Sequence, residues 1–377
     1  MIIVAYLYNT NGMASWCWEA AHALAEAGQA VTLVCAPGLD LPETSQVNVL
    51  RFAPPQSALS GSKIARELNR VSSKSSEFVF HLHTHLEQVG IVPTVYLLNQ
   101  SDLLDVRVNV PQHVVAWAYP TSLAGYVLKV NKIAGRKPSL NTIRVLLDAV
   151  GWWRKDWQSY RTATSVLAVT ERLRVDISKA GVPVYTVHPG TAVRSVNSCP
   201  DSQTPCRIVI CAQDLEDSRK RILFLLKSLE NIPPDKYRLT LVGQAGDRFK
   251  ETVRQKSLSL TFTGPQRRDD VQRILAESDI FLFGSCLDDW GYVLVEAMGQ
   301  GLCVVAPNIP PFDEIVGDCG VLYSAFSTDD LHTKISSLLD TNLKPTREAA
   351  QARAVELFSR NAFSKRLMSA AAEEKGV

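Results

Sequence analysis

The stretch DIFLFGSCLDDWGYVLVEAMGQGLCVVAP, residues 279–307, contains a predicted strand, a loop, a predicted helix and a second strand. Its two outer runs, DIFLFG and LCVVAP, are short and rich in β-branched and aromatic residues, which is typical of buried strands. Between them, Gly291 precedes a segment with helical apolar spacing over Tyr292–Gly299. A strand–helix–strand order predicts a parallel unit with a right-handed crossover.

The same alternation extends backward to residue 206. Three more apolar strands, RIVICA, YRLTLVG and SLTFTG, alternate with helices expected at 221–229 and near 271–277. Five short strands that alternate with helices predict a doubly wound domain.

The N-terminal part shows this pattern less regularly. A strand is expected at 2–8, a helix at 14–27 and a strand at 30–36, with further strands at 78–83, 114–117 and 165–169. The polar, turn-rich run RSVNSCPDSQTP (194–205) is the best candidate for a linker.

These patterns predict an α/β protein with two Rossmann-like, doubly wound domains that face each other across a cleft. The expected divisions are a first domain at 1–190, a linker at 191–205, a second domain at 206–350 and a C-terminal helix at 351–377 that packs back toward the first domain. Ligands of open α/β sheets bind at the carboxyl ends of the strands, so we expect the site there.

Composition excludes several classes of protein. Of the 377 residues, 46% are hydrophobic and 21% are charged, and the net charge of +2 indicates no general attraction to nucleic acid. The eight cysteines show no Cys-x-x-Cys pair, which favours buried reduced thiols over a zinc site. The N-terminus resembles a strand rather than a signal peptide, and no stretch is apolar enough to span a bilayer. We therefore expect a cytoplasmic protein.

Acidic residues surround the start of the helix in the opening stretch. Asp288 and Asp289 lie in the loop, and Glu296 lies one turn into the helix. A helix start presents unpaired N–H groups and a partial positive charge, which suit a diphosphate. A carboxylate there can accept hydrogen bonds from ribose or sugar hydroxyls. The alternative is that one aspartate caps the helix and Glu296 is solvated.

This stretch resembles the signature of the GT-B glycosyltransferases of family 4, in which two glutamates are separated by seven residues. Asp288 and Glu296 form the pair, Trp290–Gly291 replaces Phe-Gly, and Glu296 begins the family's Glu-Ala-Met. The resemblance implies that Glu296 binds the ribose and Asp288 the transferred sugar. The backbone of Gly291, Tyr292 and Val293 would bind the diphosphate.

Other segments also resemble this family. LTLVGQAG (239–246) contributes Gly243, and LTFTGPQRRDDVQRILAESDIFLFGS (260–285) contributes Gly264 next to the nucleotide base. DEIVGDCGVLY (313–323) and SVLAVTERLRVDISKAGVPVYTVHPG (165–190) are similar as well, whereas residues 40–160 match poorly. Gly12 follows the first strand, where the family has two glycines near the donor phosphate; an ordinary turn glycine is the alternative.

The segment DSRKRILFLLKSLE (217–230) places three consecutive cations, Arg219, Lys220 and Arg221, near a helix start. Cations there are unfavourable unless an anion is close. Lys220 lies where the family has a lysine that pairs with the diphosphate, and Arg219 is a second candidate. A solvated cation on an exposed helix start is the alternative.

Three departures from the family are evident. Asp288 is one methylene shorter than glutamate, so donor handling is expected to differ. Pro310–Pro311 replaces two glycines and cannot offer N–H groups to a ligand. Ala118 and Tyr119 lie where the family often has a histidine near the reacting sugar.

The run His81-x-His83-x-His85 would share one face of a strand. We expect one of these histidines, assigned as His83, to line the acceptor side at the carboxyl end of a strand at 78–83. A solvated loop histidine is an equal alternative, and a zinc site is a weaker one because no carboxylate or cysteine partner is evident.

Residues 125–161 are basic and rich in tryptophan. They suggest peripheral contact with an anionic membrane at its inner face, or a site for an anionic acceptor. A solvated basic face with buried tryptophans is the alternative.

The resemblance implies transfer of a hexose-type sugar, with retention, from a UDP- or GDP-linked donor to a glycan, lipid-linked or small-molecule hydroxyl acceptor. It implies no metal and no cofactor beyond the donor, with Asp288, Lys220 and His83 as catalytic candidates. Two alternatives stay open, a sugar-nucleotide isomerase of the same fold and a non-catalytic sugar-nucleotide or glycan-binding protein.

Overall fold

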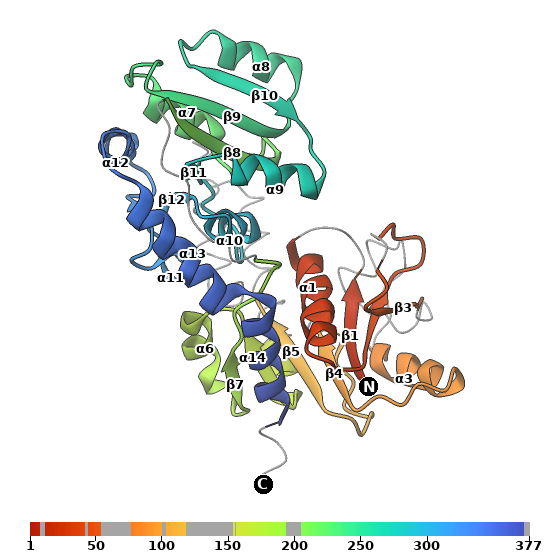
Figure 1. The fold of residues 1–377 in the computed structure, drawn as a ribbon. Helices are drawn as coiled ribbons and strands as arrows, with labels where there is room; N and C mark the ends of the chain where they lie inside the picture. Colours follow the sequence, from red (N-terminus) through yellow and green to blue (C-terminus); the bar gives the residue numbers. More distant parts are fainter. Residues whose placement is uncertain are drawn as a thin grey trace, which may run out of the picture. The chain divides into compact units, whose positions relative to one another are not determined.

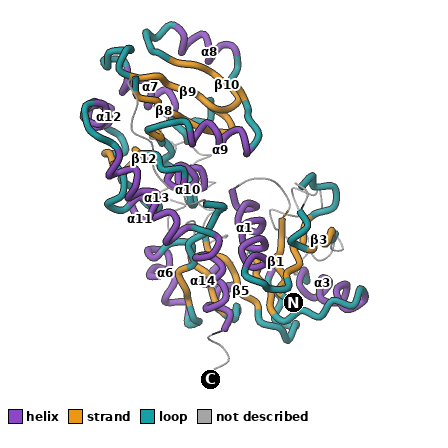
Figure 2. Tube along the Cα trace, viewed as in Figure 1, coloured by secondary structure: helices purple, strands orange, loops and turns teal. Residues whose placement is uncertain are grey.

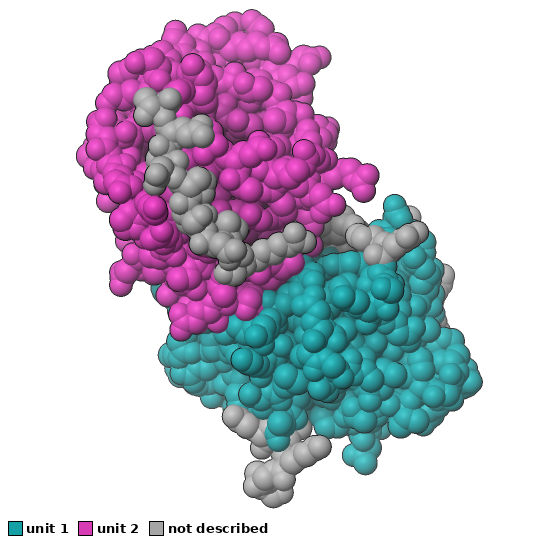
Figure 3. All heavy atoms as spheres, in the orientation of Figure 1, with its two compact units in different colours: residues 1–128, 138–190, 360–377 teal, residues 129–137, 191–359 magenta. Residues whose placement is uncertain are grey.

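The computed structural model describes residues 1–7, 12–41, 44–53, 77–99, 103–117, 154, 156–193 and 205–372. These residues form two compact units, shown in different colours in Figure 3. Unit 1 contains the described residues of 1–128, 138–190 and 360–377, and unit 2 contains those of 191–359. Each unit has its own parallel sheet and its own core, and each is described by itself below.

The sheet of unit 1 has the strand order β3-β2-β1-β4-β5-β6-β7, and every neighbouring pair is parallel. Its strands are β1 (Ile2–Leu7), β2 (Val31–Cys35), β3 (Asn48–Arg51), β4 (Val95–Leu98), β5 (Gln112–Ala116), β6 (Ser165–Ala168) and β7 (Val184–Thr186). The central strands are buried along their whole length, as expected for a sheet covered on both faces.

The helices of unit 1 alternate with these strands (Figures 1 and 2). They are α1 (Gly12–Glu26), α3 (Phe78–Gln88), α6 (Glu171–Ile177), the short 3₁₀ helix η3 (Ser178–Ala180) and α14 (Arg360–Ala372). The hydroxyl of Thr170 caps α6 by accepting a hydrogen bond from the Leu173 N–H at 3.2 Å.

The predicted strand at 78–83 is wrong, because these residues begin helix α3. One side of this helix is buried and consists of Phe78, Val79, Leu82 and Leu86. The spacing of these residues is that of a helix and not the alternation of a strand. The three alternating histidines are typical of a strand, but the buried apolar residues of this segment have helical spacing.

The C-terminal tail consists of two helices and not one. α13 (Lys344–Phe358) belongs to unit 2, and α14 belongs to unit 1, where it packs beside α1 (Figure 1). Arg360 donates hydrogen bonds to Glu19 at 2.7 Å and to Glu26 at 2.6 Å, and Phe363 contacts Trp16 edge to face. The chain therefore returns to the first domain, as the predicted fold required.

The sheet of unit 2 has the order β10-β9-β8-β11-β12-β13, again with parallel pairs throughout. Its strands are β8 (Cys206–Asp214), β9 (Tyr237–Gln244), β10 (Leu260–Gly264), β11 (Ile280–Leu282), β12 (Cys303–Pro307) and β13 (Val321–Tyr323). The strand order reverses between β8 and β11, which is the switch point of a Rossmann-like sheet.

The helices of unit 2 are α7 (Ile222–Leu229), α8 (Asp247–Arg254), α9 (Arg268–Ala276), α10 (Tyr292–Gly299), α11 (Phe312–Val316), α12 (Thr328–Leu339) and α13. Helix α10 has the predicted bounds and packs against α13. Its apolar residues are buried on most of its surface, so the polar side chain of Glu296 is an exception on this helix.

A buried ionic cluster joins the sheet of unit 2 to α13. Asp279 is fully buried, and its carboxylate accepts hydrogen bonds from the guanidinium groups of Arg207 at 2.9 Å and Arg347 at 3.1 Å. Arg347 also donates to the Gly301 carbonyl at 2.6 Å. A buried charge is tolerated only when it is paired in this way.

The structure thus confirms the predicted α/β class and its two Rossmann-like sheets. None of the described helices is both long enough and apolar enough to cross a membrane.

Candidate functional site

The loops that follow β8 and β11 lie at the switch point of the unit 2 sheet. In parallel sheets, such loops bind ligands because the strand order reverses there and leaves a crevice at the carboxyl ends. The loop after β8 carries Lys220, and the loop after β11 carries Asp288. The structure therefore places the two main predicted site residues at the expected edge of the sheet.

Lys220 and Asp288 form a direct ion pair. The Lys220 Nζ atom lies 2.6 Å from Asp288 Oδ2, and the two side chains keep 23% and 20% of their exposure. The Lys220 N–H donates to the Asp217 carbonyl at 2.9 Å, which fixes the turn that carries it. The pair joins the two loops across the switch point and stays accessible to a solute.

The three consecutive cations have three different partners. The guanidinium of Arg219 binds the Asp217 carboxylate, with its shortest contact at 2.6 Å. Partial burial alone would raise the pKa of Asp217, but the hydrogen bonds from Arg219 lower it overall. Arg219 was a predicted donor ligand, yet the structure pairs it with its own loop and leaves Lys220 as the cation at Asp288.

Arg221 is a structural residue. It adopts a left-handed backbone conformation, with φ 51°, at the position that precedes α7. Its buried guanidinium donates to the carbonyls of Gly284, at 2.7 Å, and Ala325, and to the hydroxyl of Tyr323 at 3.2 Å. It also lies 4.5 Å from the ring centroid of Phe224. Arg221 therefore ties the loop after β8 to the loops after β11 and β13.

The N-cap residue of α10 is Gly291, with φ 109°, and it has no side chain that could cap the helix. The alternative in which Asp288 or Asp289 is the N-cap residue is therefore wrong. No described residue accepts a hydrogen bond from the Val293 N–H, whereas the N–H groups of Leu294 and Val295 donate to the Gly291 carbonyl. An uncapped helix start of this kind can bind an anion.

The start of α8, at the end of β9, differs. There the Glu216 carboxylate accepts a hydrogen bond from the Gly246 N–H at 2.7 Å. A side chain of the protein thus already occupies that helix start, and this leaves α10 as the better anion site of the two.

Trp290 and the prolines shape the base of α10. Trp290 is 2% exposed and packs edge to face on Phe358 of α13. We predicted that it binds the donor, but its buried ring supports the loop instead. Pro311 precedes α11, whose first residue Phe312 packs on Phe283 and lies close to Gly291. The two prolines therefore place an aromatic ring beneath the start of α10.

Glu296 lies within an ion pair that the sequence did not suggest. Its Oε1 atom accepts a hydrogen bond from Arg268 at 3.0 Å, and its side chain is 14% exposed. The same nitrogen of Arg268 donates to Thr191 Oγ1 at 3.0 Å. The alternative of a solvated glutamate is therefore wrong. The only sequence signal for Arg268 is a cation at the first residue of α9, where a cation is unfavourable without an anion.

The thiol of Cys211, in β8, lies close enough to both Lys220 and Glu296 to respond to their charges. Burial and, after it, the charge of Glu296 raise the pKa of this thiol to about 12, while the charge of Lys220 acts in the opposite direction. Both groups therefore act on one atom at the end of the central strand. The buried hydroxyl of Ser285, which follows β11, has no hydrogen-bond partner among the described residues and is a further polar group at this edge.

The predicted glycines have steric reasons. Gly243 has φ 143°, and a Cβ there would lie 1.9 Å from the Ala212 carbonyl oxygen, so the strands β8 and β9 approach too closely for any side chain. Gly264 has φ 74° and open space around it, so only its backbone conformation requires glycine. Gly12 is the first residue of α1 in unit 1, directly after a segment outside the described residues.

His83 is not at the carboxyl end of a strand. It lies in the middle of α3, where its Nδ1 atom is 2.9 Å from the hydroxyl of Tyr96 and its Nε2 atom is 3.5 Å from Glu87. Tyr96 is the second residue of β4, so this ring lies near the amino end of the strand, away from the ligand-binding edge. Among the described residues, no group of three or more histidines, cysteines or carboxylates could hold a metal ion.

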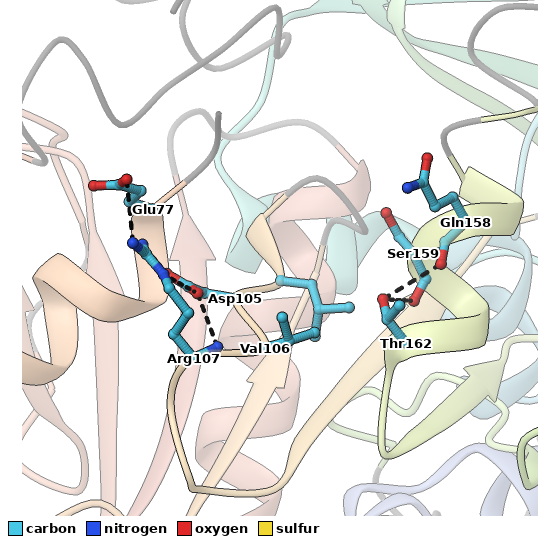
Figure 4. A pocket seen from close by; sticks show the side chains of 8 residues that line it. Glu77, Asp105, Val106, Arg107, Gln158, Ser159 and Thr162 are labelled. Atoms are coloured by element: carbon cyan, nitrogen blue, oxygen red, sulfur yellow. Dashed lines mark hydrogen bonds and ion pairs between the residues drawn. The ribbon is translucent and has the colours of Figure 1, made fainter. Parts of the chain in front are cut away.

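A surface hollow of about 440 Å³ lies in unit 1 (Figure 4). Arg107 on its wall binds Asp105 at 2.9 Å and Glu77 at 3.2 Å, so its charge is balanced by two carboxylates. The opposite wall carries Gln158, Ser159 and Thr162. Without an unpaired charge or a nucleophile, this hollow supports no assignment.

Comparison with known proteins agrees with the position of the site. Residues 206–341 match the family described as glycosyl transferases group 1. A sulfoquinovosyl transferase of Arabidopsis thaliana is 31% identical over 137 residues, which are 34% of this chain and 26% of that protein. The chain thus matches about a quarter of the length of this relative.

Solved structures extend the likeness to the whole chain. Sucrose-phosphate synthase from Thermosynechococcus elongatus has a TM-score of 0.71 at 15% identity, over 99% of this chain and 98% of that chain. HepE from Anabaena, in complex with UDP and glucose, has a TM-score of 0.62 at 15% identity over 99% and 100%. WaaG, a glycosyltransferase of lipopolysaccharide biosynthesis, has a TM-score of 0.61 at 16% identity over the full length of both chains. These likenesses establish the GT-B fold, with the group 1 match in its second unit.

Proposed function

We propose that this protein is a glycosyltransferase that moves a sugar from a nucleoside diphosphate sugar to a hydroxyl acceptor. The observation that carries the proposal is the meeting of Lys220, Asp288 and the uncapped start of α10 at the switch point of the unit 2 sheet. The match of residues 206–341 to the glycosyl transferases group 1 supports it.

The diphosphate of the donor would bind between Lys220 and the first turn of α10. Lys220 supplies a full positive charge, and the backbone N–H of Val293 supplies a hydrogen-bond donor aligned with the helix dipole. Negative charge builds on the diphosphate as the bond to the sugar breaks. Groups placed there before the reaction stabilise that charge without reorganisation.

Glu296 would bind the ribose of the nucleotide, since an ionised carboxylate can accept hydrogen bonds from both vicinal hydroxyls. Arg268 holds this carboxylate from the side of α9, so that its orientation is set before the donor binds. Asp288 would accept hydrogen bonds from hydroxyls of the sugar. The position of His83 gives it no part in this scheme.

The donor proposed first is a UDP-linked hexose. One structural relative is described in complex with UDP and glucose, and the curated relative is a sulfoquinovosyl transferase. Retention of configuration and independence of metal are proposed from the family resemblance. The names of these relatives indicate no single class of acceptor, so a glycan, a lipid-linked or a small-molecule acceptor is proposed equally. Contact of residues 125–161 with a membrane stays a prediction, and most of these residues lie outside the described ones.

The experiment incubates the protein with UDP-glucose, GDP-mannose or ADP-glucose and measures the released nucleoside diphosphate, with titration calorimetry for binding. Glu296→Ala should weaken the binding of the preferred nucleotide about a hundredfold, because two hydrogen bonds to a charged group are lost. Glu251→Ala, at an exposed glutamate of α8, is the matched control and should change nothing.

Three results would contradict the proposal in different ways. Unchanged nucleotide binding by Glu296→Ala would show that the site is elsewhere. Conversion of the sugar nucleotide into an isomer without release of the diphosphate would favour an isomerase. Tight binding of the donor without release or conversion, across acceptors of all three classes, would favour a binding protein.

A further inference from the structure

The ion pair between Lys220 and Asp288 raises a question about the order of events at the site. Lys220 is the cation of the run 219–221 whose side chain pairs with Asp288, since Arg219 binds Asp217 and Arg221 is enclosed by carbonyls. Among the described residues, Asp288 is the only hydrogen-bond partner of the Lys220 ammonium group. The group proposed to bind the diphosphate is therefore already neutralised by a residue of the protein.

We propose that Asp288 competes with the diphosphate for Lys220, and that this competition weakens the binding of the released nucleoside diphosphate more than the binding of the intact donor. Asp288 would thus be a residue that favours product release. This inference rests on the proposed function and deepens it, because it assigns to one carboxylate two different partners before and after transfer.

The argument follows from charge. A diphosphate that reaches Lys220 must also approach the Asp288 carboxylate, because the two side chains touch at 2.6 Å. Like charges at such distances repel, and the repulsion is strong where solvent is partly excluded, as for these side chains with about a fifth of their surface exposed. Binding of any diphosphate at Lys220 is therefore weakened for as long as Lys220 stays paired with Asp288.

The intact donor offers a compensation that the product does not. The sugar carries hydroxyl groups, and a carboxylate that has lost its lysine can accept hydrogen bonds from them. After transfer the sugar is gone, so Lys220 is the only hydrogen-bond donor to the Asp288 side chain among the residues that the structure describes. Its return to Lys220 withdraws positive charge from the diphosphate and lowers the affinity for the product.

The test compares a nucleotide with its own sugar nucleotide by titration calorimetry. The pairs are UDP with UDP-glucose, GDP with GDP-mannose and ADP with ADP-glucose, and the pair that binds the wild-type protein is used. Asp288→Asn keeps the shape of the side chain but removes the charge. We expect it to tighten the nucleotide about five- to tenfold, as for the loss of one close like charge. The affinity for the sugar nucleotide should stay constant or fall.

Two further variants isolate the cause. Asp289→Asn makes the same change of net charge in the same loop and should leave the ratio of the two dissociation constants unchanged. Lys220→Gln should weaken both ligands, and in the double variant Lys220→Gln/Asp288→Asn the selective effect of Asp288→Asn should be reduced to less than twofold. Thermal unfolding of each variant checks that the fold is retained.

Each outcome decides the proposal. A selective gain in nucleotide affinity for Asp288→Asn, present with Lys220 and absent without it, supports competition. Equal changes for both ligands, a weaker nucleotide, or the same effect in Asp289→Asn overturn it while leaving the proposed function intact. If no nucleotide or sugar nucleotide binds the wild-type protein, both the inference and the proposed function fail.

Discussion

Arg221 offers a sharp test of how the site loops are held together. Its backbone is left-handed, with φ 51°, a conformation that residues other than glycine rarely adopt. The structure shows the compensation, because its guanidinium donates to two buried carbonyls and to the Tyr323 hydroxyl. Burial raises the pKa of Tyr323, so the hydroxyl stays neutral and donates to the Phe283 carbonyl while it accepts from Arg221.

The magnitude follows from these contacts. Arg221→Ala leaves the carbonyls of Gly284 and Ala325 without their donor, at a cost of about 1–2 kcal/mol each. The Tyr323 hydroxyl keeps its hydrogen bond to the Phe283 carbonyl, so the loss of its bond to Arg221 adds little to the destabilisation. The loss of packing on Phe224 brings the expected destabilisation to about 3–4 kcal/mol. Arg221→Gly loses the same contacts but has no strain, so it should be about 1 kcal/mol more stable than Arg221→Ala.

The assay is urea unfolding followed by circular dichroism, fitted with a separate transition for each unit where two are seen. The change should appear in the transition of unit 2. An alanine variant within about 0.5 kcal/mol of the wild type would refute the role of the enclosed guanidinium. A glycine variant less stable than the alanine variant would refute the account of backbone strain.

Two further predictions concern stability. Gly243→Ala should destabilise unit 2 by more than about 3 kcal/mol, because a Cβ would overlap a carbonyl oxygen of the neighbouring strand. Gly264→Ala should cost only about 1 kcal/mol, because the space around Gly264 is open and only its backbone conformation is strained. Equal melting temperatures for the two variants would contradict this prediction. Burial lowers the pKa of His113 to about 4 from an ordinary 6.5, so the unfolded chain binds more protons between these values, and unit 1 should lose about 2–3 kcal/mol between pH 7 and pH 4.5. His113→Gln, which does not titrate and can still bond to Ser165, should remove this part of the pH dependence in urea unfolding, and an unchanged dependence would refute it.

Local patterns in the sequence were sufficient to predict many of the helices and strands of unit 2. The run Tyr292–Gly299 forms a helix with the predicted bounds, because apolar spacing and the glycine before it are properties of adjacent residues. The prediction for α3 was wrong, because this segment contains two patterns at once. Its histidines alternate as in a strand, whereas Phe78, Leu82 and Leu86 have helical spacing.

The sequence by itself determined the two alternating α/β regions, the acidic pair Asp288 and Glu296, and a basic run near one helix start. Only the tertiary structure decided which cation of that run reaches Asp288, since the two partners are 68 residues apart and meet because the strand order reverses between β8 and β11. It also decided that Arg268 holds Glu296, across 28 residues. Periodicity reports which face of an element is buried, whereas pairing between loops depends on how the sheet brings the ends of distant strands together.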